Sequence, residues 1–330
     1  MSSIPFITYN PSIGFQLTQE TEYFLSSISQ TPIAVLSIVG NYRTGKSFFI
    51  NRVLLNKTNG QGFTVGPSIN PCTKGLWLWN EPLTHQNPDI SSDIKVLLID
   101  TEGFGGIDQN LSHNSRIGLF SLLLSSFFIY NSLGIIDENS MNSLSLIVSL
   151  GQEIMKQGEN SGIFPSFLWV LRDFALQMIN AEGETMSNRD YLEKALEHNN
   201  KMNETKNKTR KIIRDIFGER ECITMVRPVA SEKDLQKLDG LDEKIFRPEF
   251  VEQMKKARNM IFSRIKPKKI NGKILTAGLL LELCKNFITV INGEKVPDIK
   301  STWVYLCKSQ MSSTFSGNFC FGMSYFLNKI

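Results

Sequence analysis

The residues with the clearest chemistry lie at positions 40–47, which read G-N-Y-R-T-G-K-S and fit the phosphate-loop pattern G-x-x-x-x-G-K-[ST]. In such a loop, backbone N–H groups and the N-terminal end of the next helix face a bound phosphate, and the lysine, here Lys46, reaches the terminal phosphates. The two glycines permit the turn. Residues 33–39 before it are apolar and β-branched, as in a buried parallel strand, and residues 48–55 after it have helical spacing. Strand, loop and helix therefore follow one another in the order that a nucleotide site requires.

A second motif lies at residues 94–103, which read I-K-V-L-L-I-D-T-E-G, an apolar run that ends in D-x-x-G. The four-residue pattern is weak by itself. Downstream of a phosphate loop, at the end of an apolar strand, it is the expected partner of that loop. We therefore expect Asp100 to lie near a bound Mg²⁺ and the Gly103 N–H to sense a γ-phosphate.

A third buried strand, at residues 164–174, ends in Arg172-Asp173. A carboxylate at this place can accept two hydrogen bonds from the N1–H and N2–H₂ edge of guanine. Adenine has an acceptor at N1 and no amino group at C2, so it would leave the aspartate unpaired. A surface salt bridge is the alternative role for Asp173, and the spacing leaves both roles open.

The remaining segments alternate between helix and strand. A Gly- and Pro-containing stretch at 58–71 predicts a long mobile connection, and a charged stretch at 230–246 predicts a loop. This alternation predicts an α/β fold, a three-layer P-loop NTPase domain with a mostly parallel central sheet flanked by helices. Helices are expected at 18–28, 48–55, the first part of 111–133, 137–157, twice within 180–218, 250–265 and 274–291, and further strands at 75–79, 127–130 and 222–226.

Composition excludes several classes of protein. The 330 residues carry a formal charge of +4 from 36 basic and 32 acidic residues, which is too balanced to indicate a nucleic-acid binder. Five scattered cysteines without C-x-x-C spacing and three histidines suggest neither a disulfide scaffold nor a zinc site. Because the N-terminus also lacks the features of a signal peptide, a reducing, cytoplasmic setting is predicted.

Two features bear on membranes. Residues 117–136 form a run of twenty without a charge, but the run contains serines, asparagine and glycines and divides into a helical half and a β-like half. We expect a buried helix and a core strand rather than a membrane span. Basic residues gather at 206–214 and 266–273, where a solvated helix face is favoured and peripheral contact with acidic lipid stays open. No aromatic residues interleave there to stack bases, so no nucleic-acid partner is expected.

Four motifs together, G-N-Y-R-T-G-K-S, C-T-K-G-L-W-L-W, L-L-I-D-T-E-G-F-G and W-V-L-R-D-F, resemble the large GTPase domain of guanylate-binding proteins, within the dynamin superfamily. The similarity runs from about residue 14 to about residue 300. It implies a GTPase domain over residues 1–303, and for residues 304–330 a tail or the truncated start of a helical domain. It also implies binding of GTP and GDP with Mg²⁺, and hydrolysis of GTP to GDP.

The resemblance assigns roles residue by residue. Lys46 would bind the β- and γ-phosphates, and Glu102 would help to position the attacking water. The implied metal ligands are Ser47 and Thr73, with Asp100 holding the ion through water. The implied nucleotide contacts are Asn41, Tyr42, Arg43, Thr44, Gly45, Lys46, Ser47, Phe48, Thr73, Gly103, Arg172 and Asp173, and the implied catalytic residues are Arg43, Lys46, Thr73 and Glu102.

Arg43 matches the internal arginine finger of the family, which turns onto its own nucleotide when two domains pair across their nucleotide faces. An arginine aimed at the transferring phosphoryl group neutralises charge in the transition state. The alternative is an arginine that packs against the phosphate loop or faces solvent. The resemblance also places a guanine cap, a dimer surface, at residues 230–246, and so implies a nucleotide-dependent homodimer.

The chain departs from the family at three places. Pro71 stands where vertebrate members have a serine thought to orient the water, and proline has neither a hydroxyl nor an N–H. Val170 replaces the usual threonine or asparagine three residues before Asp173. Most of the long C-terminal helical domain is missing from the 330 residues. An alternative function is therefore a GTP-gated binding module that hydrolyses weakly and acts through a partner.

Overall fold

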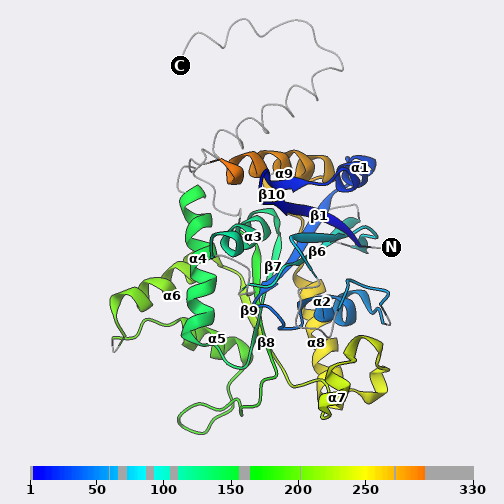
Figure 1. Cartoon of the computed structure of the whole chain (residues 1–330). Helices are drawn as coiled ribbons and strands as arrows, with labels where there is room; N and C mark the ends of the chain where they lie inside the picture. Colours follow the sequence, from blue (N-terminus) through cyan, green and yellow to red (C-terminus); the bar gives the residue numbers. More distant parts are fainter. Residues whose placement is uncertain are drawn as a thin grey trace, which may run out of the picture.

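The computed structural model of the chain (Figure 1) describes residues 3–58, 60–65, 73–86, 93–104, 111–155, 164–200, 202–270 and 273–293. Pro71, much of the predicted connection at 58–71 and the tail at 304–330 lie outside these residues.

A mixed β-sheet forms the centre of the domain, with nine strands in the described ranges. The strands are β1 (Ser3–Asn10), β2 (Gly14–Leu17), β3 (Ile33–Gly40), β4 (Leu76–Trp79), β5 (Leu83–His85), β6 (Ile94–Thr101), β7 (Phe127–Leu133), β8 (Ser166–Arg172) and β9 (Arg220–Met225). Five adjacent strands, in the order β6, β3, β7, β8 and β9, are parallel. The others pair antiparallel and extend the β6 edge. A separate small hairpin joins β10 (Lys269–Ile270) to β11 (Lys273–Ile274).

Helices cover both faces of this sheet. They are α1 (Gln19–Ser27), α2 (Lys46–Phe49), the π-helix η1 (Ile50–Leu55), α3 (Leu111–Leu124), α4 (Glu138–Met155), α5 (Asn188–Leu196), α6 (Glu204–Ile216), α7 (Glu232–Leu235), the 3₁₀ turns η2 (Leu238–Gly240) and η3 (Glu243–Ile245), α8 (Pro248–Arg264) and α9 (Ala277–Asn292). One core joins the sheet to α1, α3, α4, α5, α6 and α9. The other joins it to α2, η1 and α8, which lie across the sheet from α3 and α4 in Figure 1.

The alternation of side chains along the strands produces these two cores. In β3, Val35 belongs to the core under α3, whereas its neighbour Leu36 belongs to the core under α8. Every residue of β3 is buried. A strand that is buried on both faces needs a continuous apolar sequence, which explains why this strand was predicted directly from residues 33–39.

The three-layer α/β prediction is confirmed, and the uncharged run at 117–136 forms most of α3 followed by β7. Among the described residues, no helix is long and apolar enough to cross a membrane. The helix predicted at residues 48–55 is present, but its α-helical part α2 ends at Phe49 and the rest is the π-helix η1. The Arg258 guanidinium donates to the carbonyls of Val53 and Leu54 and so satisfies the end of this wider helix.

The strands β1 and β2 were not predicted. They form a hairpin on the edge of the sheet, and the side chain of Asn292, at the end of α9, covers the outer edge of β2. Its amide accepts from the Phe15 N–H (2.8 Å) and donates to the Phe15 carbonyl (2.7 Å). This contact spans 277 residues of sequence and leaves no local signal. The expected loop at 230–246 contains α7, η2 and η3, and the basic turn at 266–273 contains β10 and β11.

Candidate nucleotide-binding site

The phosphate loop connects β3 to α2 at the centre of the parallel strands. β3 lies between β6 and β7, so the strands that follow it in sequence are added first on one side of β3 and then on the other. Parallel α/β sheets bind their ligands at such a point, at the carboxyl ends of the strands. Gly45 and Arg43 in this loop have left-handed backbones, with φ of 79° and 63°. For arginine this conformation costs about 1 kcal/mol, and such strain is typical of functional loops.

Close approach of backbone explains two of the glycines. A Cβ on Gly40 would lie 1.9 Å from the Asn131 carbonyl oxygen, on the neighbouring strand β7. A Cβ on Gly103 would lie 2.5 Å from Tyr42 Cα and 2.8 Å from Lys46 Nζ. The end of β6 therefore packs against the phosphate loop with no room for any side chain at position 103.

The lysine of the loop folds back on the loop itself. Lys46 Nζ donates to the Asn41 carbonyl (3.1 Å), and Thr44 Oγ1 donates to the same carbonyl (2.8 Å). The amide of Asn131 in turn donates to the Thr44 carbonyl (2.9 Å). Burial lowers the pKa of Lys46 to about 8, while the negative charges of Asp100 and Glu102 oppose this shift. The ammonium group of the loop thus lies within the electrostatic influence of two carboxylates.

Asp100 gathers two hydroxyl groups at the end of β6. Its Oδ2 accepts hydrogen bonds from Ser47 Oγ (2.5 Å) and Thr73 Oγ1 (3.3 Å). Its Oδ1 is buried and accepts no hydrogen bond from any residue that the structure describes. Burial raises the pKa of Asp100, and the bond from Ser47 and the charge of Lys46 act against that rise.

These oxygen donors fit Mg²⁺, which binds through one or two carboxylates or hydroxyls and completes its shell with water and phosphate oxygens. The described residues contain no cluster of three or more His, Cys, Asp or Glu side chains that would indicate a different metal site. The orphaned Oδ1 is an acceptor for which a metal-bound water would supply the missing donor.

Sequence reasoning missed the partners of Glu102. Its Oε2 accepts from the Gly75 N–H (2.8 Å) and lies 3.2 Å from His113 Nε2 in α3. The imidazole of His113 stacks on Phe15 (centroids 5.5 Å apart) and meets the edge of Tyr9 (4.7 Å). The side chains of Glu102 and His113 are 12% and 13% exposed. The sequence offered one signal of this contact: His113 is one of only three histidines and lies eleven residues after Glu102.

A cavity of about 590 Å³ opens beside the loop. One wall is formed by the phosphate loop, Thr73 and Gly103. The facing wall is formed by part of the segment at residues 231–246, which we call the cover segment. The predicted site residues that line the cavity are Tyr42, Arg43, Gly45, Lys46, Ser47, Phe48, Thr73, Gly103 and Arg172. Those that do not line it are Asn41, Thr44, Asp100, Glu102 and Asp173.

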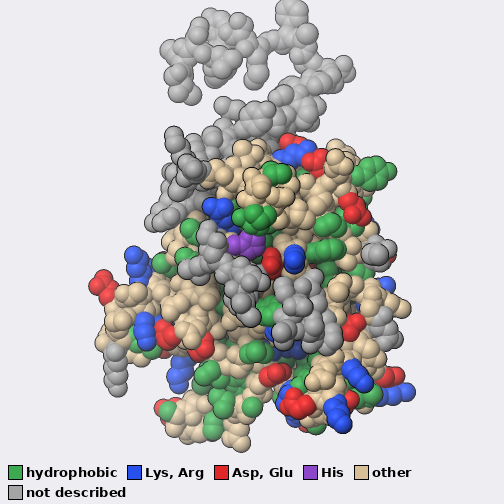
Figure 2. Space-filling view, in the orientation of Figure 1, with side chains coloured by type: hydrophobic (Ala, Val, Ile, Leu, Met, Phe, Trp, Pro, Cys, Tyr) green, Lys and Arg blue, Asp and Glu red, His purple; other side chains and the backbone are tan. Residues whose placement is uncertain are grey.

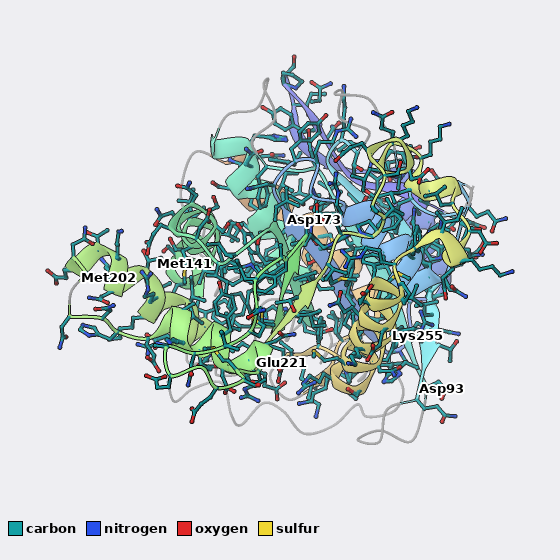
Figure 3. The ribbon with its side chains drawn as sticks, turned by 90° about the horizontal axis from the view of Figure 1, so that it is seen from below. Asp93, Met141, Asp173, Met202, Glu221 and Lys255 are labelled. Atoms are coloured by element: carbon teal, nitrogen blue, oxygen red, sulfur yellow. The ribbon has the colours of Figure 1, made fainter. Side chains whose placement is uncertain are left out.

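Arg172 and Asp173 are adjacent in sequence, but their side chains line different cavities. Arg172 is buried, donates to the Gly45 carbonyl (3.3 Å) and lies over the rings of Phe48 and Phe250, and burial lowers its pKa to about 10. Asp173 is exposed, with φ of 55°, and lines a second cavity of about 520 Å³ with Arg227 and other residues. In Figure 3, Asp173 and Glu221 mark opposite ends of the β8–β9 pair.

Asp173 forms no ion pair with any described residue, although its negative charge opposes the lowering of the Arg172 pKa. Arg43 is exposed, and its guanidinium lies 5.1 Å from the centre of the Tyr42 ring. It therefore rests at the mouth of the cavity, on the same loop as Lys46.

A parallel sheet with a phosphate loop after its central strand, a buried lysine and a hydroxyl-carboxylate cluster defines a P-loop NTPase domain. The family described as "Guanylate-binding protein, N-terminal domain" matches residues 14–270. The chain belongs to the guanylate-binding protein family.

Individual relatives agree with this assignment. The chain is 33% identical over 320 residues to guanylate-binding protein 1 of Chlorocebus aethiops, covering 92% of this chain and 52% of that protein. It is 34% identical over 307 residues to guanylate-binding protein 1 of Homo sapiens, covering 88% and 50%. The chain therefore spans about half the length of these relatives. The solved structure of a bacterial selenocysteine-specific elongation factor, EF-Sec, matches with a TM-score of 0.32 and 11% identity over 72% of this chain and 30% of that one. The fold assignment rests on the sheet rather than on this match.

Proposed function

We propose that this domain binds GTP and GDP with Mg²⁺ and hydrolyses GTP to GDP. The observation that carries the proposal is the cavity in which the phosphate loop, the Lys46 ammonium group and the hydroxyl groups of Ser47 and Thr73 face one another. These groups match the needs of a triphosphate and its metal ion, since they supply amides, a cation and oxygen ligands in one place. Membership of the guanylate-binding protein family supports guanine as the base.

The binding step would exchange contacts within the loop for contacts to phosphate. Lys46 Nζ, which now donates to the Asn41 carbonyl, would turn to the β- and γ-phosphate oxygens. Ser47 and Thr73 would hold Mg²⁺ directly and Asp100 would hold it through water. The metal would neutralise charge that develops on the phosphate oxygens. The Gly103 N–H, next to Lys46, would report the γ-phosphate.

The chemical step needs an oriented water. Glu102 is the proposed positioning group, and the Gly75 N–H and His113 fix its carboxylate from two directions. Because the aromatic rings of Phe15 and Tyr9 hold the imidazole, His113 would act as a positioning residue for Glu102. Pro71 supplies neither a hydroxyl nor an N–H. Glu102 and the groups that fix it would therefore have a larger share in orienting the water than they would have with a serine at position 71.

Base recognition would use the second cavity. We propose that Asp173 accepts hydrogen bonds from the N1–H and N2–H₂ edge of guanine there, while Arg172 stabilises the phosphate loop by donating to the Gly45 carbonyl. Replacing Asp173 with asparagine should reduce the preference for GTP over ATP. Equal affinities of the unaltered chain for the two nucleotides would contradict the assignment.

Stimulation by homodimerisation is the finer part of the proposal. Arg43 lines the cavity, is exposed, and has the left-handed backbone noted above, with φ of 63°. Two domains would pair across their nucleotide faces, with the cover segment in the contact, and Arg43 would turn onto the transferring phosphate of its own domain. The domain would extend over residues 1–303 in a cytoplasmic protein, with peripheral membrane contact as a further expectation.

A second candidate is a GTP-gated binding module that hydrolyses weakly. Pro71 favours it, because a residue with neither a side-chain hydroxyl nor an N–H stands where the family resemblance implies a serine that orients the water. A single-turnover assay separates the two functions. Hydrolysis of bound GTP within minutes supports the enzyme, whereas GTP that stays intact for hours supports the binding module.

A further inference from the structure

The cover segment forms one wall of the nucleotide cavity but has almost no core of its own. None of its residues from 231 to 245 is buried, and α7, η2 and η3 contain no buried side chain. Charged side chains of both signs gather at the lower right of Figure 2, over the region where Figure 1 draws α7. Leu235, Leu238 and Leu241 are only half-buried against the core, and Phe246 at the end of the segment is buried. A segment with so few apolar contacts depends strongly on the polar contacts that hold it in place.

One side chain provides most of these contacts. Arg52, on η1 directly after the phosphate-loop helix, donates through Nη2 to three backbone carbonyls of the segment, at Leu238 (3.0 Å), Asp239 (3.1 Å) and Leu241 (2.5 Å). Arg52 is 8% exposed although it carries a charge. A buried charge of this kind is tolerated when carbonyl oxygens solvate it, and each charge-assisted bond is stronger than a neutral one.

Aromatic rings hold the same guanidinium from its sides. It lies 5.1 Å from the centre of the Phe246 ring and 5.9 Å from the Phe48 ring, while Phe48 and Phe246 contact each other edge to face. Phe48 follows Ser47 directly in the chain and lines the cavity. The position of the cover segment is thus tied through Arg52 to the residues that would bind phosphate and metal.

A second link joins the segment to the turn after η1. Asp239 Oδ2 accepts from the Gly60 N–H (2.7 Å), and the negative charges of Asp239, Glu243 and Asp242 oppose the lowering of the Arg52 pKa by burial. Arg258, on α8, donates to the carbonyls of Val53 and Leu54 in η1 and forms no hydrogen bond with the cover segment among the described residues. Arg52 thus bonds to the cover segment, whereas Arg258 bonds to η1.

We propose that Arg52 is a positioning residue that fastens the cover segment over the nucleotide cavity and thereby sets the rate at which nucleotide leaves. The proposal rests on the function proposed above in its second half only, since the fastening itself needs no nucleotide. Once the contacts that hold the segment in place are broken, the segment can move away from the cavity and a bound nucleotide can leave. Loss of the Arg52 contacts should therefore raise the exit rate.

The first experiment measures the fastening alone. Hydrogen–deuterium exchange of the full, nucleotide-free chain would follow the amides of residues 235–241, several of which bond within the segment. In Arg52→Met their exchange should rise about tenfold, the factor that corresponds to one lost charge-assisted hydrogen bond. Exchange in α6 should not change. An unchanged rate at 235–241, or an equal rise in the control Arg258→Met, would overturn the proposal.

The second experiment measures the exit rate with N-methylanthraniloyl-GDP as the probe. Dissociation from Arg52→Met should be about tenfold faster than from the unaltered chain. Arg52→Lys keeps the charge and donors without the planar fork and should lie between the two, and it serves in place of Arg52→Met should that variant fail to fold. The control Arg210→Met removes another buried arginine, which bonds to Ala195 and Lys206 carbonyls on the opposite face of the sheet, and should leave the rate unchanged.

Equal dissociation rates for Arg52→Met and the unaltered chain would overturn the control of nucleotide exit. Failure of the unaltered chain to bind the probe at all would contradict the proposed function instead. In that case the exchange measurement still decides whether Arg52 fastens the segment, so the two failures are distinguishable.

Discussion

The two walls of the cavity are built in different ways. The phosphate-loop wall consists of strand ends and buried polar groups, with Lys46 7% exposed and Asp100 fully buried. The cover wall consists of short turns that contain no fully buried side chain, and we propose that its position depends on a few polar contacts. The first wall is rigid because backbone packs on backbone at Gly40 and Gly103. We expect the chemistry to belong to the rigid wall and the exchange of nucleotide to belong to the cover wall.

The largest effect should come from Arg43→Ala. Arginine fingers are worth roughly 10³-fold or more in the rate of phosphoryl transfer. Specific activity of the unaltered chain should rise with protein concentration, because the finger acts when two domains pair. The variant should lose this rise and most of the activity. Turnover measured across a range of protein concentrations checks the prediction, and unaltered hydrolysis in the variant would remove the paired-finger mechanism.

The rigidity of the phosphate-loop wall can be tested at Gly103. In Gly103→Ala the new methyl group meets Tyr42 Cα and Lys46 Nζ at less than normal contact distance. Overpacking of this kind costs about 1–3 kcal/mol, which corresponds to a loss of GTP affinity of up to about 100-fold. Gly218→Ala is the matched control, because a Cβ there meets nothing within 4 Å. Calorimetric titration with GTP measures both, and equal affinities would show that the wall yields.

Orientation of Glu102 should have a smaller effect. His113→Ala removes the imidazole that lies 3.2 Å from the carboxylate. We expect kcat to fall about tenfold with little change in KM, because displacing a catalytic group by about 1 Å can lower the rate by up to about 100-fold. His113→Gln retains a donor and should recover part of the loss. A change in KM alone, with kcat maintained, would indicate that His113 serves structure rather than the chemical step.

The smallest effect should come from the cover wall, in Asp239→Asn. The substitution keeps an acceptor for the Gly60 N–H but removes a negative charge beside Arg52. Exchanging a charged hydrogen bond for a neutral one costs about 1 kcal/mol, so dissociation of the GDP analogue should accelerate about fivefold. Stopped-flow fluorescence measures this rate. An effect on single-turnover hydrolysis larger than the effect on dissociation would contradict the division between the walls.

Local motifs predicted the phosphate-loop wall, whereas the location of the cover wall came only from the family resemblance and the contacts that hold it were not predicted. The phosphate loop and the β6 end are recognisable because their backbone geometry demands glycine, lysine and hydroxyl residues at fixed local spacing. Residues 231–246 lack such a demand, and Arg52 meets Leu238 across 186 positions. The same holds for the β1–β2 hairpin, whose edge is closed by Asn292, and for His113, whose partners come from three separate elements.

The prediction for residues 48–55 illustrates a different limit. Apolar spacing predicts that a segment is helical and partly buried, but it does not separate an α-helix from a π-helix. The extra width of η1 depends on groups far away, such as Arg258, which lies 205 positions from Val53. Asn51 adds a second constraint from outside the helix, because its side chain bonds to the N–H and the carbonyl of Phe63.

The most direct measurement is a titration of the purified chain with GTP and with ATP in the presence of Mg²⁺, and again with the metal removed by a chelator, for the unaltered chain and for Lys46→Ala. We predict Mg²⁺-dependent binding that is tighter for GTP than for ATP and that is lost in the variant. Binding that needs neither Mg²⁺ nor Lys46, or no binding of either nucleotide, would contradict the account.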